Sequence, residues 1–189
     1  MMNFAKTMLA GLLLAPLAAA ADDMSYTWVD AAYVDLDLDI PGAPSGDGYA
    51  LKGSVGFAQH WFAFAEYDAL SIDVVDVNLM SAGLGGHYGL TDHLDLVGRA
   101  GYLQIDVSAP GPDPGSESGY LASLGLRGRL ADRVELEGSY MQRDTGNGDE
   151  GVWTAGGRFH FTPAFSAGVE YEMGDDNDNL FFAGVRYTF

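Results

Sequence analysis

The chain has 189 residues, a formal net charge of −18 and no cysteine. The negative charge argues against nucleic-acid binding, because a polyphosphate would be repelled. The length suits one domain, and the lack of cysteine fits an exported protein that avoids mispaired thiols.

The N-terminal residues have the pattern of a cleaved secretory signal. Lys6 supplies a positive charge, residues 8–20 are largely apolar, and Ala18 to Ala20 are small residues before the expected cut. A transmembrane anchor is the alternative, but the apolar run is shorter than the roughly 20 residues that span a bilayer. We therefore expect residues 1–20 to be a signal peptide and residues 21–189 to be one exported domain.

Ten segments of that domain alternate apolar and polar residues with a period of two. Side chains along a strand point to opposite faces in turn, so each segment predicts a strand with one apolar face. The predicted strands are 24–35, 47–57, 61–71, 76–88, 94–105, 118–130, 134–143, 151–161, 165–173 and 179–189.

Short and long connections alternate between these strands. The short ones centre on Gln59, Thr91, Asp132 and Pro163. The long ones run over residues 35–47, 70–75, 106–118, 144–151 and 174–179. Outer-membrane barrels have this arrangement, with short turns in the periplasm and longer loops outside the cell.

Aromatic residues gather at both ends of the apolar faces. Beside the short turns are Phe57, Trp61, Tyr88, Phe161, Phe165 and Phe189. Beside the long connections are Tyr49, Tyr67, Tyr102, Tyr120, Tyr140, Trp153, Tyr171 and Phe181. Two aromatic belts separated by small aliphatic residues are typical of the two interfaces of a membrane.

These patterns predict an all-β fold, a closed antiparallel up-and-down transmembrane β-barrel in the outer membrane. The segment count favours ten strands, with eight as the alternative. A soluble periplasmic barrel that binds a ligand is a further alternative, and the outward aromatic belts argue against it.

All seven basic residues of the predicted strands, and seven of the acidic ones, lie opposite the apolar face. The basic ones are Lys52, Arg99, Arg127, Arg129, Arg143, Arg158 and Arg186, and the acidic ones are Asp30, Glu66, Asp95, Glu135, Glu137, Glu170 and Glu172. A cation that faces lipid at mid-depth costs about 2–4 kcal/mol, so this face is expected to line the interior. On strand 24–35, placing Asp30 inside also places Trp28 inside.

Hairpin geometry predicts which of these charges face each other, because opposed residues on one face of a hairpin lie within contact range. The expected pairs are Lys52 with Glu66, Arg127 with Glu137, Arg129 with Glu135, and, where the barrel closes, Asp30 with Arg186. Such pairs either fill and stabilise a small barrel or form a narrow polar path for ions.

Acidic residues dominate the long connections and the strand ends beside them. They are Asp35, Asp37, Asp39, Asp47, Asp68, Asp73, Asp76, Asp106, Asp113, Glu117, Asp144, Asp149, Glu150, Asp175, Asp176 and Asp178. Their solvation and mutual repulsion keep loops hydrated. Divalent-cation binding is the alternative, with Asp175, Asp176 and Asp178 as candidate ligands, but EF-hand spacing is absent. No metal site and no cofactor are therefore predicted.

Catalysis is not expected. The four histidines, His60, His87, His93 and His160, all map to the short-turn end, away from the acids of the long loops. The sequence has no HExxH motif and no recognisable Ser-His-Asp arrangement.

Three stretches carry a family resemblance. The ending Tyr187-Thr188-Phe189, together with the alternating strands and acidic loops, resembles the small outer-membrane β-barrel superfamily that includes outer-membrane proteins A and X. Residues 51–57 (LKGSVGF) and 61–67 resemble a ten-stranded gammaproteobacterial family discussed in connection with quorum sensing and biofilm formation.

The resemblance implies a place in the outer membrane among lipid and lipopolysaccharide. It also implies that the barrel assembly machinery reads Tyr187 and Phe189 as a C-terminal signal, and it brings no catalytic residues. We expect a monomer with a structural and surface-interaction role through acidic extracellular loops, and a narrow pore for ions or small polar solutes is the alternative.

Overall fold

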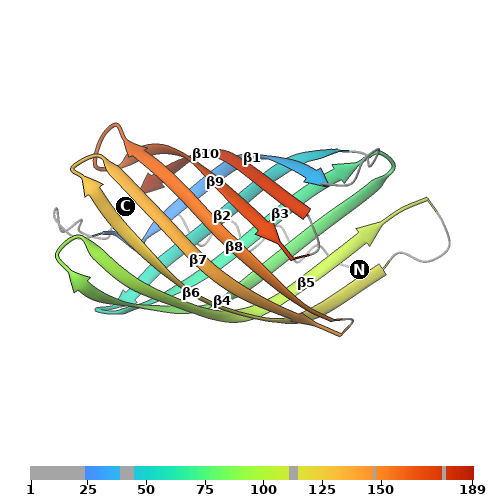
Figure 1. The fold of residues 1–189 in the computed structure, drawn as a ribbon, viewed down its shortest axis with the longest axis horizontal. Coiled ribbons are helices and arrows are strands. Elements are labelled where there is room, and N and C mark those ends of the chain that lie inside the picture. The colour runs from blue at the N-terminus through green and yellow to red at the C-terminus, as the bar shows by residue number, and fades with distance from the viewer. Residues whose placement is uncertain (1–23, 39–44, 111–114, 147, 176–177) are drawn as a thin grey trace, which may run out of the picture.

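The computed structural model describes residues 24–38, 45–110, 115–146, 148–175 and 178–189. The strands in these ranges are β1 (Trp28–Leu38), β2 (Gly46–Ala58), β3 (Trp61–Ile72), β4 (Val75–Thr91), β5 (Leu94–Ser108), β6 (Gly115–Ala131), β7 (Val134–Thr145), β8 (Gly148–His160), β9 (Phe165–Gly174) and β10 (Asp178–Thr188). Each strand pairs antiparallel with its sequence neighbours, and β1 pairs with β10 to close the barrel (Figure 1). The predicted ten-stranded up-and-down barrel is confirmed.

All ten predicted strands are present, with bounds that differ by a few residues. The largest difference at a strand start is in β1, which begins at Trp28 because residues 24–27 leave the sheet. The predictions of long connections over residues 70–75 and 144–151 are wrong, since β3 and β4 are joined by the two-residue turn Asp73–Val74 and only two residues lie between the end of β7 and the start of β8. Asp73 has a φ of 55°, a left-handed conformation that aspartate tolerates better than most residues.

The predicted signal peptide, residues 1–20, lies outside the described residues. Within the described ranges, no helix is long and apolar enough to cross a membrane.

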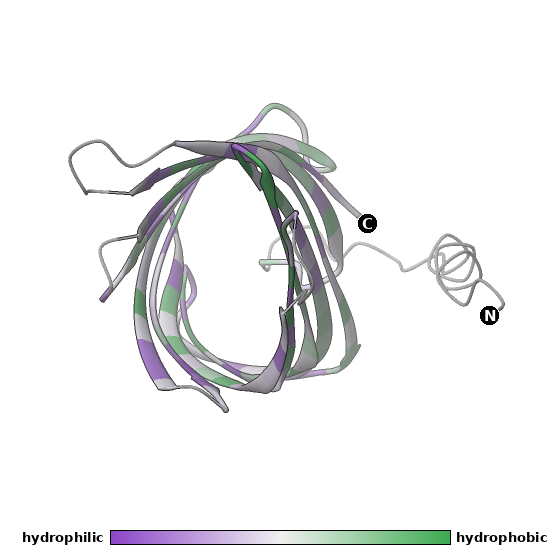
Figure 2. Cartoon of the chain, turned by 90° about the vertical axis from the view of Figure 1, so that its right-hand side faces the viewer, coloured by the Kyte–Doolittle hydropathy of each residue, from purple (hydrophilic) through white to green (hydrophobic). Residues whose placement is uncertain are grey.

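The outward face of the barrel is apolar between two belts of aromatic side chains. Figure 2 shows the hydropathy alternating along the strands of the ring. Side chains of the two predicted belts are exposed, for example Tyr120 at 71% beside the long connections and Tyr88 at 66% beside the short turns. Such exposure of aromatic side chains would be unfavourable in water and suits the two interfaces of a bilayer.

The basic residues of the strands lie inside. Arg186 is only 5% exposed, and Lys52, Arg99, Arg143 and Arg158 have side chains that are mostly buried. Trp28 is buried with Asp30, as the alternation predicts. We call the end with the four short turns and the C-terminus the periplasmic end, and the opposite end the outer end.

The polarity of β1 inverts toward the outer end. Val34 is fully buried in the interior, where it packs with Ala50 and Phe182, whereas Asp35 and Asp37 are exposed on the outside. A wall that continues past the lipid meets water on its outer surface, so polar residues are favoured there and apolar residues can pack inside.

A glycine inside the barrel makes room for an aromatic ring. Gly85 on β4 lies against the ring of Phe62 on β3, and a Cβ at this position would overlap that ring. Phe62 is 1% exposed, so the glycine weakens the strand locally but allows tight packing of the interior.

Candidate functional site

Ion pairs join strands that are not neighbours across the middle of the interior. The ammonium of Lys52 on β2 lies 2.6 Å from Oε1 of Glu170 on β9, and two strands, β1 and β10, separate them in the sheet. Arg99 Nη1 on β5 lies 3.2 Å from Glu66 Oε1 on β3. Such pairs tie separate parts of the wall together.

Nearer the outer end, Arg143 on β7 connects two carboxylates. Its Nη2 donates to Glu172 Oε2 at 3.2 Å, and its Nη1 lies 3.6 Å from Glu150 Oε2. The mid-barrel and outer charges are linked, because Glu172 Oε1 is also 4.0 Å from Lys52 Nζ.

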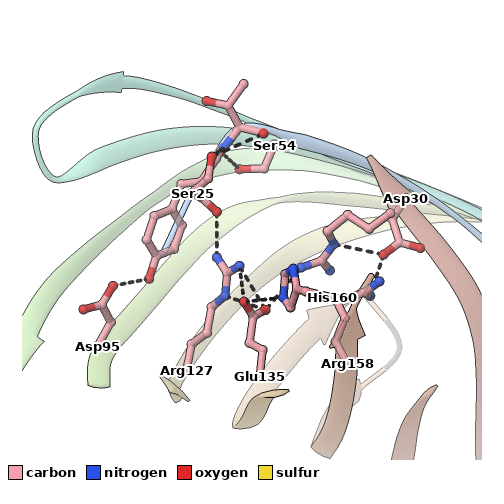
Figure 3. Close-up of polar contacts among 11 residues, drawn as sticks. Ser25, Asp30, Ser54, Asp95, Arg127, Glu135, Arg158 and His160 are labelled. Carbon is pink, nitrogen blue, oxygen red and sulfur yellow. Dashed lines mark hydrogen bonds and ion pairs between the residues drawn. The ribbon is translucent and has the colours of Figure 1, made fainter. Parts of the chain in front are cut away.

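Glu135 on β7 is the centre of the periplasmic network (Figure 3). Arg127 on β6 donates from Nε and Nη2 to its two carboxylate oxygens at 3.0 Å each. His160 Nε2 lies 3.4 Å and Arg186 Nη1 lies 3.6 Å from the same carboxylate. The bidentate guanidinium–carboxylate geometry is among the stronger polar contacts in proteins.

Asp30 on β1 extends this network to the barrel closure. Its Oδ2 accepts from Arg158 Nη2 at 2.6 Å and from Arg186 Nε at 3.0 Å. Arg186 therefore bridges Asp30 and Glu135, and the predicted contact between Asp30 and Arg186 is confirmed.

The other predicted pairs are confirmed in register but not as ion pairs. The Cα of Lys52 faces Glu66, that of Arg127 faces Glu137, and that of Arg129 faces Glu135. The ion pairs instead join Lys52 to Glu170 and Arg127 to Glu135.

Long side chains in a narrow barrel explain this difference. They extend toward the axis and reach diagonal neighbours or the far wall, beyond the range of the directly opposed residue. As a result Arg129 has no carboxylate oxygen within 4.0 Å in the part of the chain that the structure describes.

One of the acids predicted in or beside the long connections lies in the interior. Asp68 is on β3, on the same face as Glu66, and its Oδ1 is buried without a hydrogen-bond partner. Asp68 falls within the predicted strand 61–71, and β3 continues past it to Ile72.

The segment before β1 enters the periplasmic end of the interior, which the sequence did not predict. Tyr26 stacks on Phe62 at 5.0 Å and on His87 at 4.0 Å between ring centroids, and its hydroxyl donates to Asp95 Oδ2 at 2.7 Å. The carbonyl of Ser25 accepts from Arg127 Nη1 at 3.0 Å, a contact drawn in Figure 3. Tyr26 thus closes this side of the mouth.

The environment of Tyr26 keeps its hydroxyl protonated. Tyr26 precedes the first membrane-spanning strand, and burial raises the pKa of its phenol above the ordinary value. The neutral phenol is therefore the donor to Asp95 at any physiological pH.

Replacing Tyr26 by phenylalanine is expected to lower the free energy of unfolding by about 1–3 kcal/mol, because Asp95 loses a buried donor while the ring packing is kept. Urea unfolding of the protein in lipid vesicles measures the change. Tyr88→Phe, on an exposed outward ring, is the matched control and should be nearly neutral; equal effects in both variants would contradict the role of this hydrogen bond.

Two cationic groups of the interior lie over aromatic rings. Arg186 Cζ lies 3.9 Å from the ring centroid of Trp28, and Lys52 Nζ lies 4.1 Å from that of Phe182. These cation–π contacts were missed from the sequence. Their signal is visible in hindsight, because Trp28 and Phe182 stand on the charged face of their strands.

A cavity of about 90 Å³ lies among these groups, lined by Lys52, Glu66, Arg99 and Glu137 together with Trp28 and Phe64. On the basis of the volume that one water needs, it has room for a few water molecules. It has no room for a solute of sugar or nucleotide size.

Metal binding has no support in the described ranges, where no group of three or more His, Cys, Asp or Glu residues could hold an ion. Of the three candidate ligands, Asp175 is exposed. Asp176 and the side chain of Asp178 lie outside the part of the chain that the structure describes. The predicted positions of the histidines agree with the structure, and His87 and His160 contact interior acids at the periplasmic end.

Comparisons with known proteins agree on the type of barrel. A family model described as the outer membrane protein beta-barrel domain matches residues 7–189. No curated protein matches the chain.

Several solved outer-membrane barrels are similar in fold. The NanC porin has 10% sequence identity and a TM-score of 0.55, over 85% of this chain and 100% of that chain. The KdgM porin in complex with disordered oligogalacturonate has 14% identity and a TM-score of 0.49, over 86% and 99% of the two chains. Ail, the attachment invasion locus protein of Yersinia pestis, has 14% identity and a TM-score of 0.42, over 88% and 100%. At such identities, the likeness to NanC concerns the fold alone.

Proposed function

The chain belongs to the outer membrane protein beta-barrel domain family and lies in the outer membrane, and on this premise we propose that it is a closed, non-enzymatic barrel. Its role is structural, and it presents an acidic rim to the cell exterior for surface interactions.

The ion pairs that cross the interior carry this proposal. Lys52–Glu170 connects β2 to β9 in the middle of the barrel, and the Arg127–Glu135–Arg186–Asp30 chain connects β6 to β1 nearer the periplasm. Opening a path past these contacts would leave buried charges without partners, which costs several kcal/mol for each ion. Tyr26 adds a third obstacle at the periplasmic mouth.

The outer rim supports a role at the surface. Exposed acids gather there, namely Asp35, Asp37, Asp47, Asp73, Asp76, Asp144, Asp149 and Asp175. Within the described ranges, no lysine or arginine is exposed at this end. The rim is therefore hydrated and negative, so that contact with the anionic phosphates of lipopolysaccharide requires bridging cations.

The proposal also includes two expected partners, the barrel assembly machinery and outer-membrane lipid. The rings of Tyr187 and Phe189 are in edge-to-face contact at the end of β10, with centroids 4.9 Å apart, where the barrel assembly machinery would read them. A monomer surrounded by outer-membrane lipid accounts for the aromatic belts. A role in quorum sensing or biofilm formation stays a prediction.

Planar-bilayer recording tests whether the barrel is closed. We expect no steady, discrete channels from the purified, folded protein, because ion pairs cross the interior and the mid-barrel cavity has room for a few waters. Heat-modifiable migration on a gel verifies that the protein is folded.

A narrow pore is the second candidate, which the interior cavity favours. Discrete channels that change in conductance with Arg99→Gln or Glu66→Gln, but not with Leu124→Ala on the lipid face, would establish the pore and overturn the closed barrel.

A further inference from the structure

The residues just before β1 enter the barrel without joining the sheet. The pairing of β1 with both of its neighbours begins at Trp28. Thr27 is fixed to the wall, because its carbonyl accepts from the Phe189 N–H at 3.1 Å and its Oγ1 accepts from the Gly56 N–H at 3.0 Å. Residues 24–26, which we call the mouth segment, continue from Thr27 into the periplasmic end of the interior, where they pack against the buried apolar cluster of the wall.

Tyr26 of the mouth segment forms the periplasmic side of the mid-barrel cavity. The residue is 8% exposed, and it lines the cavity of about 90 Å³ beside Phe62 and Arg127. Its other contacts, Asp95 and His87, stand near the periplasmic ends of β5 and β4. The Tyr26 side chain therefore lies between the cavity and the periplasm.

Toward the outer end, side chains that are fixed on strands bound the same cavity. Glu172 on β9 lines it and accepts from Arg143 Nη2 at 3.2 Å. Further out, Val34, Ala50 and Phe182 pack into a buried apolar cluster. The mouth segment is thus a cover that can move without a change in any strand, and it lies on the periplasmic side.

The wall groups that hold the mouth segment keep other partners when it leaves. Asp95 Oδ2 accepts from the Tyr26 hydroxyl at 2.7 Å and also lies 3.3 Å from His87 Nδ1. Arg127 binds the mouth segment through Nη1, while its Nε and Nη2 donate to Glu135 (Figure 3). Withdrawal therefore breaks no hydrogen bond between strands and strands no buried charge, which is the costly event in a barrel interior.

We propose that the mouth segment is a lid that opens and closes the periplasmic entrance of the mid-barrel cavity. In the closed state the Tyr26 ring covers the cavity. In the open state residues 24–26 turn away at Thr27, and periplasmic water and uncharged solutes of a few atoms reach the cavity. The inference rests on the proposed closed barrel, because ion pairs such as Lys52–Glu170 still block passage across the membrane when the lid is open.

A single thiol in the cavity tests the lid, because the chain has no cysteine. Ser123→Cys places the thiol on the cavity wall, and Asp92→Cys, in an exposed periplasmic turn, is the freely accessible reference. Methyl methanethiosulfonate, a small uncharged reagent, is added to the folded protein in detergent micelles, and mass spectrometry follows the labelling. We expect Ser123→Cys to react at least about a hundredfold more slowly than Asp92→Cys, as for a site reached only through a rare local opening.

Changes at Tyr26 should accelerate the labelling of Ser123→Cys. Tyr26→Ala removes the cover, and we expect labelling to become about a hundredfold faster. Tyr26→Phe keeps the ring and loses one buried hydrogen bond, so about a tenfold acceleration is expected. Adding p-cresol, which reproduces the lost side chain, should restore slow labelling in Tyr26→Ala. The matched control is Tyr88→Ala, which truncates an outward ring at the same end and should leave the rate unchanged.

Heat-modifiable migration verifies that each variant is folded, and Tyr26→Phe decides the case if Tyr26→Ala does not fold. The lid is overturned by fast labelling of Ser123→Cys with Tyr26 intact, or by an unchanged rate in the Tyr26 variants. It is also overturned if p-cresol fails to slow the labelling of Tyr26→Ala or if Tyr88→Ala gives the same acceleration, since the wall is then loosened generally. These results leave the closed barrel standing, because only channels in planar-bilayer recording overturn that proposal.

Discussion

Replacing Glu135 by alanine is expected to lower the free energy of unfolding by about 3–5 kcal/mol, the range for removing one partner of a buried ion pair. Glu135 is 2% exposed and accepts two hydrogen bonds from Arg127, with Arg186 and His160 close by. Its loss would leave Arg127 buried with the Ser25 carbonyl as its remaining hydrogen-bond partner among the described residues. Urea unfolding in lipid vesicles, followed by tryptophan fluorescence, measures the change.

Asp92→Ala provides the control, because Asp92 is an exposed acid in a periplasmic turn and its removal should have little effect. A loss below about 1 kcal/mol for Glu135→Ala, within the range of exposed pairs, would show that the network contributes little to stability.

Placing an arginine on the outward face at mid-depth is expected to cost about 2–4 kcal/mol. Ala183 is suitable because it faces outward near the middle of β10, between Phe181 and Val185, whose side chains are exposed. Ala183→Arg would put a guanidinium into hydrocarbon, and the same unfolding measurement in vesicles detects the loss.

The matched control is Asn179→Arg, on the same face of β10 near its outer end. The cost there should fall to about 0–1 kcal/mol, because arginine reaches the interface. Equal costs at both positions would mean that depth in the bilayer is irrelevant, and the assignment of this face to lipid would then be wrong.

Local alternation was enough to predict the barrel. The period of two along residues 179–189 identifies the apolar and polar sides of β10, and bilayer physics requires that the side without charges face the hydrocarbon. The same logic places Arg99, Arg158 and Arg186 inside. Because hairpin register follows from turn position, the facing of Lys52 with Glu66 was also predictable.

Local alternation could not predict which residues pair with the interior charges. Lys52 binds Glu170, 118 residues away in the chain, and Tyr26 binds Asp95, 69 residues away. Such contacts depend on the curvature of the closed wall and on how far each side chain reaches across it.

The sequence by itself determined the two faces and the membrane location and favoured ten strands over eight, because these follow from properties repeated along every strand. Only the tertiary structure decided which acid satisfies which base, that residues 24–27 enter the interior, and that Arg129 has no carboxylate partner among the described residues. The physical reason is that closure of the barrel brings all ten inner faces into one small volume, where side chains compete for the same partners.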